Sequence, residues 1–147
     1  MRGFDQVPRC AMNSVFNHDG FEEMIGIYSA NGGTTTADGL AQLLEERSGG
    51  GFDDVAKYIV SRGIVSFEWR KHYWIPLFQF DMNDMSLKRG VSKVTRELSP
   101  VLDNWTLALW FTEPNVWLDG NRPVDRVDSQ ISKVLDAARA DRFVAAG

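Results

Sequence analysis

Cysteine is nearly absent from this chain of 147 residues, and long apolar runs are missing altogether. The single cysteine, Cys10, excludes a disulfide within the chain, which agrees with a reducing compartment. No stretch approaches the roughly 20 apolar residues of a membrane helix. The N-terminus also lacks the apolar run of a signal peptide. We therefore expect a cytoplasmic protein that does not act at a membrane.

Metal ligands and catalytic motifs are also scarce. Histidine occurs only as His18 and His72, and no paired Cys or His spacing typical of a metal site is present. The glycines at 49–51 are not followed by the Lys-Ser/Thr pair of a phosphate-binding loop. No Gly-x-Ser-x-Gly nucleophile motif occurs either. The sequence therefore predicts a protein that is not an enzyme and needs no metal or cofactor.

The composition is that of a folded domain, with 44% hydrophobic, 12% aromatic and 24% charged residues. The net charge of −4 is unevenly distributed. Eight basic and four acidic residues lie between positions 57 and 97, which gives this middle region a local charge of +4. A basic region in an acidic protein can mark a nucleic-acid surface, or it can be a solvated surface of mixed charges. The sequence leaves both interpretations open.

Apolar periodicity predicts the order of the secondary structure. Apolar residues repeat at helical spacing in three segments, which begin at Phe21, after Thr35 and at Phe52. We expect Thr35 to cap the second of these helices. Alternation over residues 64–80 predicts two strands joined near residues 70–73. Pro76 lacks an N–H donor, so the second strand is expected to lie at a sheet edge or to be bulged there. Further helices are expected after residue 91, with Asp103 and Ser129 as caps.

These elements predict a mainly α fold with one β-hairpin. Residues 1–20 form a poorly patterned N-terminal segment. Residues 21–82 form a helix-hairpin unit similar to a winged helix, and residues 91–147 form a small helical bundle.

The helix-hairpin unit has the order of a winged helix, whose second helix and hairpin contact DNA. Lys57 and Arg62 would lie on that helix, and Arg70 and Lys71 at the hairpin tip. Cationic side chains there could contact phosphates. Two aspartates at the start of the same helix would repel them, however. A helix-hairpin unit that only builds the core is the alternative.

The C-terminal third carries a denser pattern of uncommon residues. A tryptophan helix ends before a Pro-Asn turn at 114–115, and a Leu-x-Gly element follows at 118–120. An Arg-Pro-Val-Asp helix start then occupies 122–125. With these residues, positions 91–147 resemble the toxin-binding domain of the bacterial Xre/MbcA/ParS antitoxin family.

The resemblance implies that the chain binds and neutralises a cognate toxin by direct contact. In such systems the toxin is often a RES-domain enzyme that consumes NAD, and the antitoxin typically forms a homodimer and can bind operator DNA. An orphan that keeps the fold without a toxin is an alternative. Phe143 and Val144 could instead close the last helix onto the core. The candidate partner contacts are Trp110, Asn115, Leu118, Gly120, Arg122, Pro123, Asp125, Arg139, Arg142, Phe143 and Val144.

Overall fold

The computed structural model describes residues 10–147 of the chain. It is mainly α-helical with a small antiparallel sheet, which confirms the predicted fold class. The N-terminal half contains α1 (Cys10–Ser29), β2 (Thr34–Thr36), α2 (Ala37–Arg47), α3 (Phe52–Ser61), β3 (Phe67–Trp69) and β4 (His72–Pro76). The rest contains η1 (Leu77–Gln79), β5 (Phe80–Asp81), β6 (Ser86–Leu87), α4 (Arg89–Leu98), α5 (Asn104–Thr112), η2 (Val116–Leu118), η3 (Pro123–Asp125) and α6 (Ile131–Ala146).

Helix α1 begins earlier than its pattern suggested. The prediction placed its start at Phe21, but the helix begins at Cys10. Taken as a whole, α1 does not gather its apolar residues on one side, so helical periodicity gives little sign of its first half. Residues 1–9 of the predicted N-terminal segment lie outside the described residues.

Two of the three predicted helix N-caps are wrong and one is confirmed. The side chain of Thr36, not of Thr35, accepts the Gly39 amide at the start of α2. Thr35 belongs to strand β2, which leaves the next threonine as the cap. Helix α6 begins after Gln130 rather than after Ser129. Asp103 caps α5 as predicted, with its carboxylate accepting the Thr106 amide at 2.8 Å.

The predicted hairpin exists, but it carries a third strand. Strands occur in the order β2-β4-β3, so β4 is central and the expectation that Pro76 marks an edge strand is wrong. Pro76 pairs with Thr34 of β2, while the ladder with β3 ends at Trp74. The next amide, that of Leu77, donates to Gly33 on the β2 side. Backbone N–H groups along a strand point to alternate sides, so the nitrogen of Pro76 points away from β2. On that side β3 has already ended, and no ladder hydrogen bond is lost at Pro76.

The β3–β4 hairpin turns through only two residues, Arg70 and Lys71, because Trp69 pairs with His72. Both turn residues have positive φ angles, of 50° and 69°. This is the turn that normally selects Asn or Gly, because other side chains are strained there. The hairpin therefore projects two cations at a strained tip.

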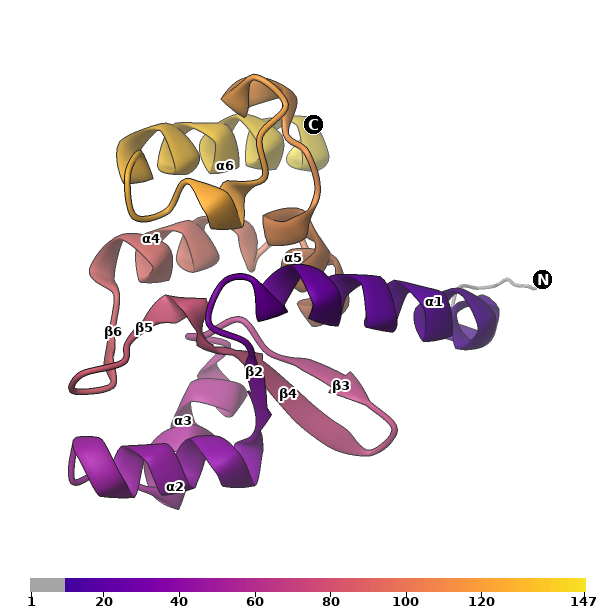
Figure 1. Ribbon diagram of the computed structural model, residues 1–147. Coiled ribbons are helices and arrows are strands. Elements are labelled where there is room, and N and C mark those ends of the chain that lie inside the picture. Colours follow the sequence, from indigo (N-terminus) through magenta and orange to yellow (C-terminus); the bar gives the residue numbers. More distant parts are fainter. Residues whose placement is uncertain (1–9) are drawn as a thin grey trace.

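Two apolar clusters form the interior. The smaller one joins α2 and α3 to β4 and β5, around Leu40, Val55 and Ile75. The larger one joins α4, α5 and α6 to α1 and to the hairpin, so it includes residues on both sides of the expected boundary near residues 83–90. Figure 1 shows α1 lying between the sheet below it and the C-terminal helices above. The proposed division into units remains a prediction.

Buried polar groups connect α1 and the hairpin to their surroundings. The Tyr28 hydroxyl of α1 donates to the Ala108 carbonyl of α5 at 2.7 Å. Burial raises the pKa of Tyr28 well above its ordinary value. The fully buried amide of Gln79 accepts the Val65 N–H and donates to the Val65 and Pro76 carbonyls. The Tyr28 bond therefore ties α1 to α5, and the Gln79 bonds tie the segment before β3 to the end of β4.

Candidate protein-binding surface

Asn115 organises the turn that follows α5. Its backbone N–H donates to the Asn121 carbonyl, and its own carbonyl accepts the amides of Leu118 and Gly120. Its side-chain oxygen accepts the Trp117 amide at 2.9 Å. The turn needs a residue that replaces backbone hydrogen bonds with its own amide group, which explains asparagine at this buried position.

Asp141 of α6 ties this turn to the last helix. Its carboxylate accepts the indole N–H of Trp110 at 2.7 Å and that of Trp117 at 2.9 Å. The side-chain amide of Asn115 also donates to it, at 3.1 Å. One carboxylate thus fixes two large aromatic rings and the asparagine of the turn. Sequence reasoning missed Asp141 and Trp117, because a lone Asp on an amphipathic helix usually faces solvent.

Four large apolar side chains near this junction are exposed to solvent. We call them the C-terminal apolar patch: Val116 and Trp117 of η2, which are 81% and 55% exposed, and Phe143 and Val144 of α6, which are 80% and 69% exposed. Asp141 holds the Trp117 indole and lies one helical turn before Val144, whereas Phe143, two residues after Asp141, lies on the other, outward side of α6. Phe143 and Val144 therefore do not close α6 onto the core.

An open groove of about 430 Å³ runs beside Trp117, between η2 and α6. Arg126 and Lys133 line it together with Asp119 and Asp136, and Ala137 lies deeper. A groove with charged walls beside an exposed indole suits the side chains of a protein partner better than a small apolar ligand.

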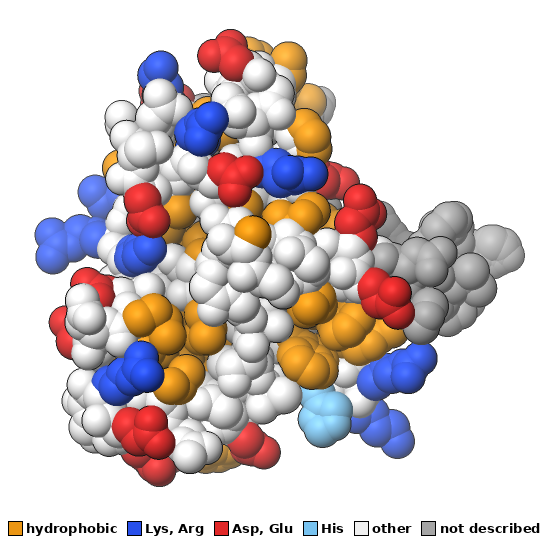
Figure 2. Space-filling view, in the orientation of Figure 1, with side chains coloured by type: hydrophobic (Ala, Val, Ile, Leu, Met, Phe, Trp, Pro, Cys, Tyr) orange, Lys and Arg blue, Asp and Glu red, His pale blue; other side chains and the backbone are white. Residues whose placement is uncertain are grey.

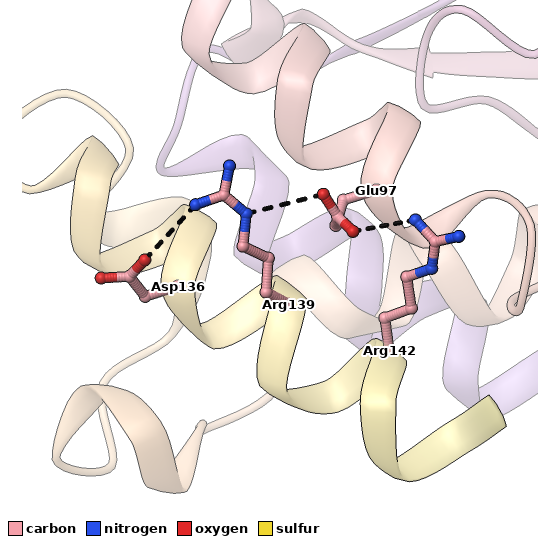
Figure 3. Close-up of polar contacts among 4 residues, drawn as sticks. All are labelled: Glu97, Asp136, Arg139 and Arg142. Carbon is pink, nitrogen blue, oxygen red and sulfur yellow. Dashed lines mark hydrogen bonds and ion pairs between the residues drawn. The ribbon is translucent and has the colours of Figure 1, made fainter. Parts of the chain in front are cut away.

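Arg139 and Arg142 extend from α6 toward α4 (Figure 3). Arg142 donates to the Glu97 carboxylate at 2.8 Å. Arg139 lies 3.7 Å from the other oxygen of Glu97 and 3.7 Å from Asp136. Both arginines remain partly exposed, so they are placed at the surface beside the apolar patch.

The other candidate partner contacts mostly build the scaffold. Leu118, Pro123 and Trp110 are all buried. Arg122 donates to the Thr112 carbonyl at 3.0 Å, which holds the turn to the end of α5. Two further candidates have local roles. Gly120 adopts a positive φ of 84°, and the Asp125 carboxylate accepts a hydrogen bond from the side-chain amide of Asn31 at 3.3 Å. The structure therefore brings together only part of the predicted set at an accessible surface.

The candidate DNA contacts also divide into residues that are engaged within the protein and residues that are exposed. Arg62 is engaged within the protein, because its guanidinium donates to Asn104 at 2.7 Å and to the carbonyls of Ser99 and Leu102. These bonds anchor the end of α3 to the α4–α5 loop in place of the predicted phosphate contact. Lys57 is exposed on α3.

Arg70 and Lys71 occupy the exposed hairpin tip, with the Arg70 guanidinium 5.5 Å from the centre of the Trp69 ring. Figure 2 shows cationic side chains and a histidine gathered over this end of the hairpin. Helix α3 itself exposes Phe52, Asp53 and Val60, of which Val60 is 85% exposed. This is not the face of a helix that reads DNA, because apolar and acidic groups gain nothing from phosphates.

Within residues 10–147, no helix is both long enough and apolar enough to cross a membrane. No group of three or more His, Cys, Asp and Glu residues in the described chain could hold a metal ion. No known family model matches this chain. No curated protein and no solved structure matches it either. The proposal of a function therefore depends on the geometry and on the sequence pattern.

Proposed function

We propose that this protein is an antitoxin-like, cytoplasmic binding protein that neutralises a cognate toxin through the C-terminal apolar patch. The observation that carries the proposal is the exposure of Trp117, which Asp141 holds in place, together with Phe143 and Val144 at the end of the same helix. Exposed aromatic and aliphatic side chains in a cluster are typical anchors of protein interfaces. The proposal includes no catalytic step by this chain.

The junction supplies the preorganisation that a binding surface needs. Asp141 fixes the Trp117 ring before a partner arrives, so less side-chain entropy is lost on binding. The resemblance of residues 91–147 to antitoxin domains indicates the kind of partner, and a RES-domain enzyme that consumes NAD is the class of toxin it suggests. A homodimer is part of the same proposal.

Affinity purification of the tagged protein from its native cells tests this function. We expect one protein to be recovered in stoichiometric amount and to be lost when Phe143→Ser and Val144→Ser are combined. Val60→Ser is the matched control, since Val60 is at least as exposed as Phe143 and Val144 but lies on α3. Failure to recover any protein, with the chain folded and both neighbouring genes expressed, would contradict the proposal and leave an orphan that keeps the fold.

A second candidate function is DNA binding through the hairpin. It is favoured by the strained turn that projects Arg70 and Lys71, since strain that is retained at a charged tip can mark a functional site. Affinity for duplex DNA that falls steeply with salt, and falls further in Arg70→Ala/Lys71→Ala, is the expected result. Equal DNA affinity of the wild type and the Arg70→Ala/Lys71→Ala variant would exclude the hairpin as the DNA contact.

A further inference from the structure

Helices α4 and α6 pack side by side and run in the same direction (Figure 1). Gly90 at the start of α4 lies against Ile131 at the start of α6, and Glu97 near the end of α4 meets Arg139 and Arg142. Between them is an open groove of about 290 Å³. It is lined by Lys93, Arg96, Glu97, Leu135, Arg139 and Arg142.

The groove carries more positive charge than its own carboxylate can neutralise. Four of its six lining residues are cationic and Glu97 alone is anionic. That carboxylate is already shared between the two arginines of α6. Lys93 and Arg96 are exposed, and the only side-chain bond of Arg96 in the described chain is to the neutral Ser92 hydroxyl. A concentrated cationic groove in a chain of net charge −4 favours an anionic partner.

The groove continues into the C-terminal apolar patch. Phe143 follows Arg139 by four residues on α6, so the two side chains are neighbours on the helix surface. Leu135 gives the groove an apolar wall between the cations. A single partner could therefore place an apolar group over Phe143 and anionic groups in the groove.

From this geometry we infer that the α4–α6 groove binds an acidic polypeptide segment of the partner, whose carboxylates pair with Lys93, Arg96, Arg139 and Arg142. The inference rests on the proposed function and adds the chemistry of the partner surface. A polypeptide fits better than a nucleic acid, because Glu97 lines the groove and Asp136 pairs with Arg139, which also lines it. A phosphate backbone carries a charge at every nucleotide and would be repelled by these two carboxylates, whereas a peptide can place its acidic side chains around them.

A synthetic deca-glutamate peptide is the probe, titrated into the full chain at low salt and followed by NMR. We expect shifts at the amides of Lys93, Arg96 and Leu135, and affinity that falls with added salt. Lys93→Glu/Arg96→Glu should weaken binding by about ten-fold. Arg70→Glu/Lys71→Glu changes the net charge equally at the hairpin and should weaken it by less than about two-fold. Lys93→Gln/Arg96→Gln gives a milder test if the reversed pair alters folding.

Equal weakening by the two charge reversals would overturn the inference, because the peptide would then respond to net charge alone. Shifts confined to other surfaces would do the same, as would duplex DNA that displaces the peptide from the groove. The proposed function is tested separately. If the partner protein is lost in Phe143→Ser/Val144→Ser but its affinity is unchanged in Lys93→Glu/Arg96→Glu, the function stands and the acidic partner segment does not.

Discussion

The Asp141 carboxylate accepts the indole N–H of Trp117 at 2.9 Å, between residues 24 positions apart in the sequence. The same carboxylate holds Trp110 and Asn115, so the last helix and the turn after α5 share one polar junction. This junction sets the position of the exposed ring that we place at the centre of the partner surface.

Asp141→Ala should lower the free energy of unfolding by about 2–3 kcal/mol, because hydrogen bonds to a charged group are lost and buried donors remain unpaired. Urea unfolding measures the change. Asp136→Ala on the exposed side of the same helix is the control and should change stability by less than about 0.5 kcal/mol. Similar losses in both variants would show that Asp141 has no special role.

Gly90→Ala should destabilise the protein by about 1–3 kcal/mol, because an added methyl group would overlap the Ile131 side chain at the α4–α6 contact. Gly26→Ala makes the same change in α1, where nothing lies near the new carbon. That variant should be neutral or stabilising by up to about 1 kcal/mol, since alanine favours helix. Thermal unfolding of the two variants checks the difference, and a reversed order would refute the packing account.

Arg70→Asn/Lys71→Gly should stabilise the hairpin by about 1–2 kcal/mol, because these residues tolerate the positive φ angles of the turn. Arg70→Ala/Lys71→Ala removes the same charges and keeps the strain, so it should not stabilise. Chemical denaturation of the wild type and both variants measures the free energy of unfolding of each. No difference between the two variants would mean that the turn is not strained.

Tyr28 should make stability fall in alkaline solution. Its pKa is raised in the folded protein, so the folded state keeps the proton that the unfolded chain releases above about pH 10. The contribution is therefore complete below that pH and decreases as pH rises through it. Unfolding free energies from about pH 8 to about pH 11 should decline less in Tyr28→Phe, although that variant costs about 1 kcal/mol at neutral pH. Parallel curves would contradict the assignment.

Local patterns in the sequence were sufficient to predict several elements. Phe52 and Val55 mark α3 by helical spacing, and alternation around Phe67 and Trp74 gives the hairpin. Strand β2 was not predicted, because its three threonines carry no apolar alternation and the strand depends on pairing with β4. Tertiary pairing of this kind leaves no local signal.

The sequence predicted only part of the candidate site. It left Phe143 and Val144 between a partner contact and a core position, and the structure exposes both. Arg62 was a plausible phosphate contact by its place on α3, yet its acceptors lie 37 to 42 residues further along the chain. Its role therefore depends on the α4–α5 loop, whose position the sequence alone did not reveal.

Neutralisation itself is most directly tested by bacterial growth. The protein recovered with this chain would be expressed from an inducible promoter, alone or together with the wild type, Phe143→Ser/Val144→Ser or Val60→Ser. We expect growth arrest by the partner alone, rescue by the wild type and Val60→Ser, and no rescue by the double variant. A partner that does not slow growth, or rescue by the double variant equal to that of the wild type, would contradict an antitoxin acting through the C-terminal apolar patch.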